Sequence, residues 1–227
     1  MLAAIVLATS ISWVLASYLS GKAESQAAQM LGSALKLLSR PVQAPTAAVD
    51  QDVEDEAPFP NQRAKDEAVA EELSRLRSLH PKTRAAITAA LPLGEASYRV
   101  GRYDQALSAF EDFLKGVPKT DPLRAEALEG EGYVFEAKHQ LEQALLTYDQ
   151  LVSVTKGEFM TGMGLYHRAR ILAAQGKKEE AATALVELKS TYPASAAARL
   201  AADRIRLLER EGVKIPEPAA KAVPDAG

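Results

Sequence analysis

The fold is decided by a stretch that occurs three times in the chain, first as "GRYDQALSAFEDFLKGVP" at residues 101–118. It returns as "KHQLEQALLTYDQLVSVT" at 138–155 and as "QGKKEEAATALVELKSTYP" at 175–193. Apolar residues recur at helical spacing in each copy. The copies align on one alanine, with spacings of 38 and 37 residues: Ala106, Ala144 and Ala181. The pattern therefore predicts a helical unit that repeats along the chain, and not a single isolated hairpin.

Small and large residues stand at the same offsets in all three copies. Twelve residues before the shared alanine the side chain is small: Gly94, Gly132 and Ala169. Four residues after it the side chain is large: Phe110, Tyr148 and Leu185. A residue with little or no side chain lets another backbone approach closely. Each copy is therefore predicted to be two helices that cross closely at the small residue.

This pattern resembles the tetratricopeptide repeat, W-x2-L-G-x2-Y…A-x3-F…P, over about residues 89–192. Leu93, Gly94, Ala106, Phe110 and Pro118 make the first copy the best match. The resemblance implies an all-α fold with a tetratricopeptide-like α-solenoid of three helical hairpins with flanking helices, and the N-terminal residues predict a transmembrane helix before it. It also implies that the protein binds peptides or other proteins.

The predicted transmembrane helix rests on residues 1–21, which carry no charged side chain. Twenty helical residues rise about 30 Å, the thickness of the hydrocarbon core of a bilayer. A signal peptide cleaved after Ala16 is the alternative, since "VLA" is an acceptable cleavage site. We favour an uncleaved anchor, because there is no basic segment before the apolar stretch and one helical face continues to Leu38.

Composition divides the rest of the chain. Residues 1–39 are predicted as the anchor helix and its extension, and 40–61 as a linker with four prolines and five acids. Proline removes helical hydrogen bonds and like charges repel, so we expect this linker to be an extended tether. Residues 62–212 are predicted as the helical repeat domain and 213–227 as a disordered tail.

The order of these parts resembles the ancillary SecYEG translocon subunit family, whose members have one N-terminal span, a linker and a tetratricopeptide domain. This resemblance implies a single-pass protein of the bacterial inner membrane, with its soluble domain in the periplasm, contacting translocon subunits or envelope chaperones. Lys22, Lys36 and Arg40 follow the span, and the positive-inside rule alone would place the domain in the cytoplasm. Two alternatives stay open: an envelope assembly or cell-division adaptor, and an accessory subunit that holds an enzyme at the membrane.

The sequence indicates no catalytic residues, no cofactor and no metal site. Cysteine is absent, and His80, His139 and His167 lie in no known ligand spacing. We expect these histidines to be structural or solvent-exposed. The net charge is −3, which gives no electrostatic drive towards nucleic acid.

Partner-binding candidates lie on the first helix of each repeat, which lines the concave side of a solenoid. Tyrosines at corresponding places could form an aromatic ladder along the groove, or could be partly buried between helices. The candidates are Glu95, Tyr98, Arg99, Glu126, Glu129, Tyr133, Glu136, Met163, Tyr166 and Arg170.

Overall fold

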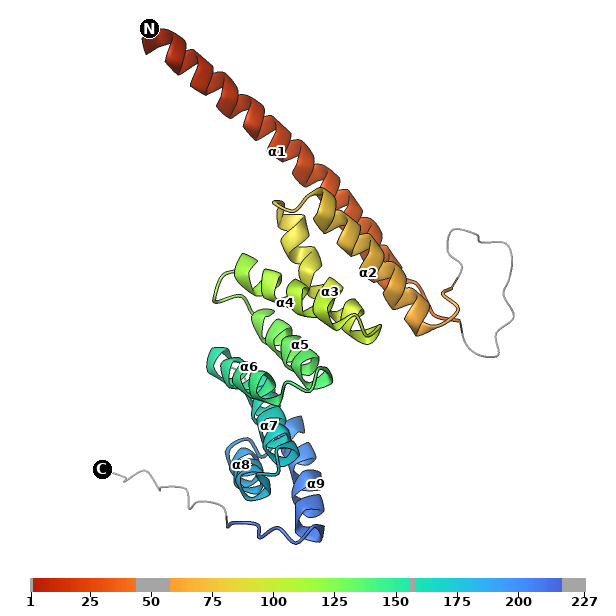
Figure 1. Ribbon diagram of the computed structural model, residues 1–227, viewed down its shortest axis with the longest axis vertical. Helices are drawn as coiled ribbons and strands as arrows, with labels where there is room; N and C mark the ends of the chain where they lie inside the picture. Colours follow the sequence, from red (N-terminus) through yellow and green to blue (C-terminus); the bar gives the residue numbers. More distant parts are fainter. Residues whose placement is uncertain (1, 44–57, 156–157, 218–227) are drawn as a thin grey trace. The chain divides into compact units, whose positions relative to one another are not determined.

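The computed structural model describes residues 2–43, 58–155 and 158–217; the side chains of residues 2–17 and 158 lie outside this description. Within the described residues the regular structure is helical, apart from one isolated bridge between Val42 and Phe59 (Figure 1). The helices are α1 (Leu2–Ser39), α2 (Gln62–Leu79), α3 (Arg84–Arg99), α4 (Tyr103–Gly116), α5 (Arg124–Ala137), α6 (Leu141–Val154), α7 (Glu158–Ala174), α8 (Lys178–Thr191) and α9 (Ala196–Arg210). The all-α prediction is confirmed.

The chain divides into two compact units, residues 1–119 and residues 120–227. Unit 1 contains α1 to α4, in which α2 packs on α3 and α3 packs on α4. Unit 2 contains α5 to α9, in which each helix packs on the next and α9 also packs on α7. The pairs α3–α4, α5–α6 and α7–α8 are the three predicted helical hairpins.

The hairpins share one turn geometry. The residue five positions before the shared alanine has positive φ in every copy: Gly101 (82°), His139 (57°) and Gly176 (81°). Its N–H donates to a carbonyl three residues back, and the next N–H donates to a carbonyl five residues back. This is the usual way for a helix to end in a left-handed residue. The middle hairpin places a histidine where the others have glycine.

The small residues lie where sequence predicts close approach. A Cβ added to Gly94 would lie 2.6 Å from the Phe110 ring, and one added to Gly132 would lie 2.5 Å from the Tyr148 ring. The shared alanine of each hairpin is completely buried. The fixed offsets therefore record a large side chain of the second helix packed against the backbone of the first.

The second half of α1 belongs to the core of unit 1. Ala27 and Ala34 are fully buried, and α1 packs against both α2 and α3. The Glu24 carboxylate accepts hydrogen bonds from the backbone N–H groups of Arg84 (2.9 Å) and Ala85 (3.1 Å), 60 residues further along the chain. A side chain of α1 therefore caps the N-terminus of α3.

The predicted transmembrane helix is not confirmed: no helix in the described part of the chain is both long enough and apolar enough to cross a bilayer, and the side chains of residues 2–17 lie outside this description.

The ends of the predicted linker lie side by side. Gln43 N–H donates to the Phe59 carbonyl (2.7 Å), and Phe59 N–H donates to the Pro41 carbonyl (2.9 Å). The Arg40 guanidinium lies 4.5 Å from the centre of the Phe59 ring. We call these contacts the clasp. Residues 44–57, the rest of the predicted tether, lie outside the described residues, but the two segments that flank them are joined and not held apart.

Unit 2 ends in a helix with a clear start signal. Ser195 Oγ accepts a hydrogen bond from Ala198 N–H (3.1 Å), as expected of an N-cap. Val213 and Ile215 lie at the start of the segment predicted as a disordered tail, yet both pack on the hydrophobic core of unit 2. Residues 218–227 lie outside the described residues.

Candidate functional site

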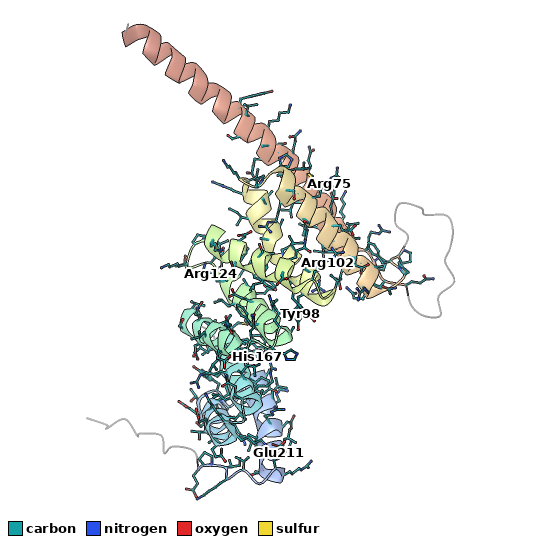
Figure 2. All side chains as sticks on the ribbon, in the orientation of Figure 1. Arg75, Tyr98, Arg102, Arg124, His167 and Glu211 are labelled. Atoms are coloured by element: carbon teal, nitrogen blue, oxygen red, sulfur yellow. The ribbon has the colours of Figure 1, made fainter. Side chains whose placement is uncertain are left out.

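The candidates of unit 1 lie at the C-terminal end of α3, where Arg99 and Tyr98 contact neighbouring helices of the same unit. The Arg99 guanidinium lies 3.0 Å from a carboxylate oxygen of Asp66, a buried residue of α2, and 3.7 Å from Glu95. The Tyr98 ring, which is labelled in Figure 2, packs at 6.0 Å against the Tyr103 ring of α4. These side chains stabilise unit 1, and Arg99 neutralises a buried carboxylate.

The candidates of unit 2 form a connected polar network between α5, α6 and α7. Arg170 of α7 donates two hydrogen bonds to the Glu136 carboxylate of α5, at 2.5 and 2.6 Å. Tyr148 of α6, which is fully buried, donates its hydroxyl to the same carboxylate at 2.6 Å. A paired arginine and carboxylate of this geometry is a strong and directional contact. Glu136 therefore ties three helices together.

His167 lies at the centre of this network and is only 3% exposed. Its Nε2 is 3.0 Å from Glu129 and 3.1 Å from the Tyr133 hydroxyl, and its Nδ1 is 3.2 Å from an Arg170 nitrogen. A guanidinium has no acceptor, so Nδ1 must accept from Arg170. Nε2 then carries the ring proton and donates it to Glu129.

Aromatic contacts surround the same imidazole. The Tyr148 ring stacks on it with centroids 4.8 Å apart and an interplanar angle of 25°. Tyr133 and Tyr166 meet it edge-on, at 5.1 and 5.7 Å. The residues around His167 are thus held by both hydrogen bonds and ring packing, which restricts their motion.

The ionisation of the network follows from burial and charge. Burial raises the pKa of the Tyr133 hydroxyl above its usual value, and the negative charge of Glu129 raises it further. Burial and the hydrogen bond to Glu136 likewise raise the pKa of Tyr148. Burial tends to lower the pKa of Arg170, but Glu136 outweighs this and the net shift is upward. At neutral pH both phenols therefore stay protonated as donors and Arg170 stays cationic.

The structure brings together four of the predicted residues, Glu129, Tyr133, Glu136 and Arg170, and sets Tyr166 against their edge. Met163 is partly buried against the core of unit 2, and Glu126 is exposed. Tyr133 and Tyr166 meet through His167, whereas Tyr98 belongs to unit 1. The partner-binding role of these residues stays a prediction.

Two members of the network were absent from the sequence-based candidates. The sequence predicts His167 only as a structural or solvent-exposed residue, and Tyr148 only as the large side chain of its repeat. Both residues carry polar atoms at repeat positions that face the candidates, and this is the signal that the sequence offers. Tyr148 follows its partner Glu136 by 12 residues, and His167 follows its partner Tyr133 by 34 residues.

The accessible edge of the network is acidic and aromatic. The Glu129 and Glu136 side chains are 21% and 17% exposed, and Glu126 is open to solvent one turn before Glu129. Both ring nitrogens of His167 are engaged. Among the described residues, no cluster of three His, Cys, Asp or Glu side chains could hold a metal ion. The edge offers hydrogen-bond acceptors and ring surface to a ligand.

Comparison with known families identifies the repeats. Two tetratricopeptide-repeat family models match, one over residues 91–158 and the other over residues 164–195. The chain thus contains tetratricopeptide repeats, and the matched residues include α4, α5, α6 and α8 completely and parts of α3 and α7. A search of curated proteins found no sequence that matches the chain.

Proposed function

We propose that the chain is a scaffold without catalytic chemistry that binds a partner protein through the edge formed by α5 and α7 in unit 2. Tetratricopeptide repeats generally bind protein partners, and both family matches include helices of this unit. The observation that carries the proposal is the network around His167. It holds Glu129, Tyr133 and Glu136 on fixed helices before any partner arrives.

Preorganisation of this kind reduces what binding costs. Immobilising a flexible side chain at an interface costs about 0.5–1.5 kcal/mol, and side chains that are already ordered avoid this loss. Glu126, Glu129 and Glu136 present carboxylate oxygens at this edge, with Arg170 as the basic group among them. The edge therefore fits a partner segment that carries basic or amide donors for these carboxylates. An apolar side chain of the same segment would pack on Tyr166 and Met163.

We further propose that the N-terminal segment holds this scaffold at a membrane. The support is the sequence, in which residues 1–21 carry no charge. The preferred partners are the protein-export translocon or periplasmic chaperones, by resemblance in the order of parts. An assembly or division adaptor and an enzyme accessory subunit are the alternatives, and co-purification in mild detergent distinguishes them by the proteins recovered.

Site-specific photo-crosslinking tests the binding edge. A photoreactive phenylalanine replaces Tyr166, and the matched control replaces Leu146, an exposed residue of α6 that takes no part in the network. We expect a discrete crosslinked protein from position 166 and a weaker or different pattern from 146. Adding Glu126→Lys should reduce the adduct at 166 without changing helicity.

Equal adducts from both positions would show that the α5–α7 edge is not the binding site. An adduct at 166 that is unaffected by Glu126→Lys would refute the acidic contribution. Carbonate extraction and a reporter fused to the C-terminus test the membrane proposal separately. Release of the full-length protein by carbonate would contradict an anchor.

A further inference from the structure

One corner of unit 1 combines exposed apolar and basic side chains at the end of the uncharged segment of α1. Tyr18, Leu19 and Leu79 are 67%, 55% and 59% exposed, whereas most other large apolar side chains that the structure describes in this unit are buried or half-buried. Lys22, Lys82 and Arg84 are also exposed. We call these six residues the corner.

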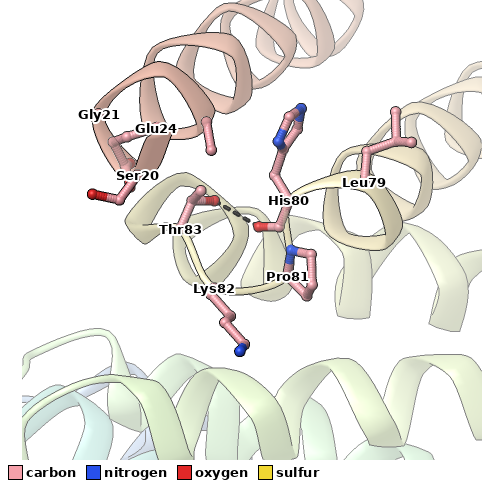
Figure 3. A pocket seen from close by; sticks show the side chains of 9 residues that line it. Ser20, Gly21, Glu24, Leu79, His80, Pro81, Lys82 and Thr83 are labelled. Atoms are coloured by element: carbon pink, nitrogen blue, oxygen red, sulfur yellow. Dashed lines mark hydrogen bonds between the residues drawn. The ribbon is translucent and has the colours of Figure 1, made fainter. Parts of the chain in front are cut away.

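The corner is built from two segments far apart in sequence. Ser20, Gly21, Ala23 and Glu24 of α1 and residues 79–83 of the α2–α3 turn line a cleft of about 560 Å³ (Figure 3). The hydrogen bonds from α3 to Glu24 hold the turn at this level of α1. The turn itself is closed by the Thr83 hydroxyl, which donates to the His80 carbonyl at 2.8 Å.

Charge is distributed unevenly around this cleft. The sequence contains no acid before Glu24 and none between Leu73 and Gly94. Arg75 and Arg77 in the second range pair with Glu72 and Asp112, so the cations of the corner are Lys22, Lys82 and Arg84. The nearby acid, Glu24, is committed to two backbone N–H groups of α3. The corner is therefore net basic, in a chain whose overall charge is −3.

We propose that this corner rests on the headgroups of an anionic lipid bilayer. An α-helix rises 1.5 Å per residue, so Glu24 and the turn bonded to it lie about 5 Å beyond Gly21, where the uncharged segment ends. A segment inserted up to Gly21 would place the turn at headgroup level. Tyrosine and leucine side chains suit the interface, and lysine and arginine suit anionic phosphates. The proposal rests on the membrane attachment proposed above.

The absence of cysteine makes a direct test possible. The full chain carrying Ser78→Cys, an exposed position in the last turn of α2, is labelled with one fluorophore and reconstituted into vesicles that contain headgroup spin-labelled lipid. The matched control is Arg63→Cys, an exposed position about 22 Å away along α2. Vesicles with phosphatidylglycerol are compared with pure phosphatidylcholine, and flotation reports whether the protein is attached.

We expect strong quenching at position 78 in anionic vesicles and little at position 63. Lys22→Gln and Lys82→Gln should each weaken the contact about fivefold. Neutral lipid or 1 M salt should also weaken it. Attached protein without quenching at position 78, or with equal quenching in both lipids, would overturn the corner proposal and leave the anchor intact. Failure of the protein to float with either kind of vesicle would overturn both the corner proposal and the membrane anchor.

Discussion

Replacing Gly132 by alanine tests whether the small residue of each repeat is there for packing. An alanine Cβ would lie 2.5 Å from the Tyr148 ring, too close for any real contact. The ring cannot easily move away, because Tyr148 is fully buried, stacks on His167 and donates its hydroxyl to Glu136. The substitution must therefore distort the α5–α6 hairpin.

The magnitude follows from two opposing contributions. Overpacking of a filled core costs about 1–3 kcal/mol, and a contact this short belongs at the upper end. Alanine regains about 1 kcal/mol of helix propensity over glycine. We therefore expect Gly132→Ala to lower the free energy of unfolding by about 2 kcal/mol, which is roughly 4–8 °C in melting temperature.

Thermal melts followed by circular dichroism, with amide exchange of α5–α6 peptides, measure this effect. Gly32→Ala is the control, since Gly32 is exposed in a helix with nothing within 4 Å of an added Cβ, and it should not destabilise. The double variant Gly132→Ala/Tyr148→Leu reproduces the alanine and leucine of the third hairpin, and its loss should be smaller than the sum of the two single losses. Additive losses, or a Gly132→Ala protein as stable as its control, would refute the packing argument.

Three further predictions concern caps, turns and ionisation. Glu24→Ala should cost about 1 kcal/mol and speed amide exchange in the first turn of α3, whereas Gln29→Ala, at an exposed position of α1, should not. His139→Gly should raise the free energy of unfolding by about 0.5–1 kcal/mol in denaturant titrations, because it removes a left-handed strain that His139→Ala would retain. Stability should fall as pH rises above about 10, because the unfolded chain ionises Tyr133 and Tyr148 there while the folded state keeps them protonated. Tyr133→Phe and Tyr148→Phe should each flatten that alkaline loss, and an unchanged pH profile would contradict the assigned burial effect.

The hairpins could be predicted from the sequence because their signals are local. Each offset, such as Gly132 to Tyr148, joins two helices separated by one short turn, and the same offset appears three times. Repetition separates this signal from chance. The left-handed residue of the middle turn was harder to see, since His139 replaces the glycine that usually marks it.

The polar network could be predicted only in part. The sequence predicts the helix faces that carry Glu129, Tyr133, Glu136 and Arg170. It does not predict their shared partner His167, because that contact depends on how α7 packs beside α6 and α5. The docking of α1 was also missed. Its buried residues are alanines, whose weak hydrophobic signal fits a buried face and an extended anchor equally well.

Because of the clasp, unit 1 does not depend on an unbroken backbone between Gln43 and Phe59. Gln43 and Phe59 are hydrogen-bonded at the two ends of the intervening segment, and α1 is held by its own packing on α2 and α3. A backbone cut between these two residues would therefore leave the N-terminal fragment associated with the remainder. The protein could work as two separately synthesised pieces that reassemble, and an inserted tag or domain at this position would leave unit 1 joined.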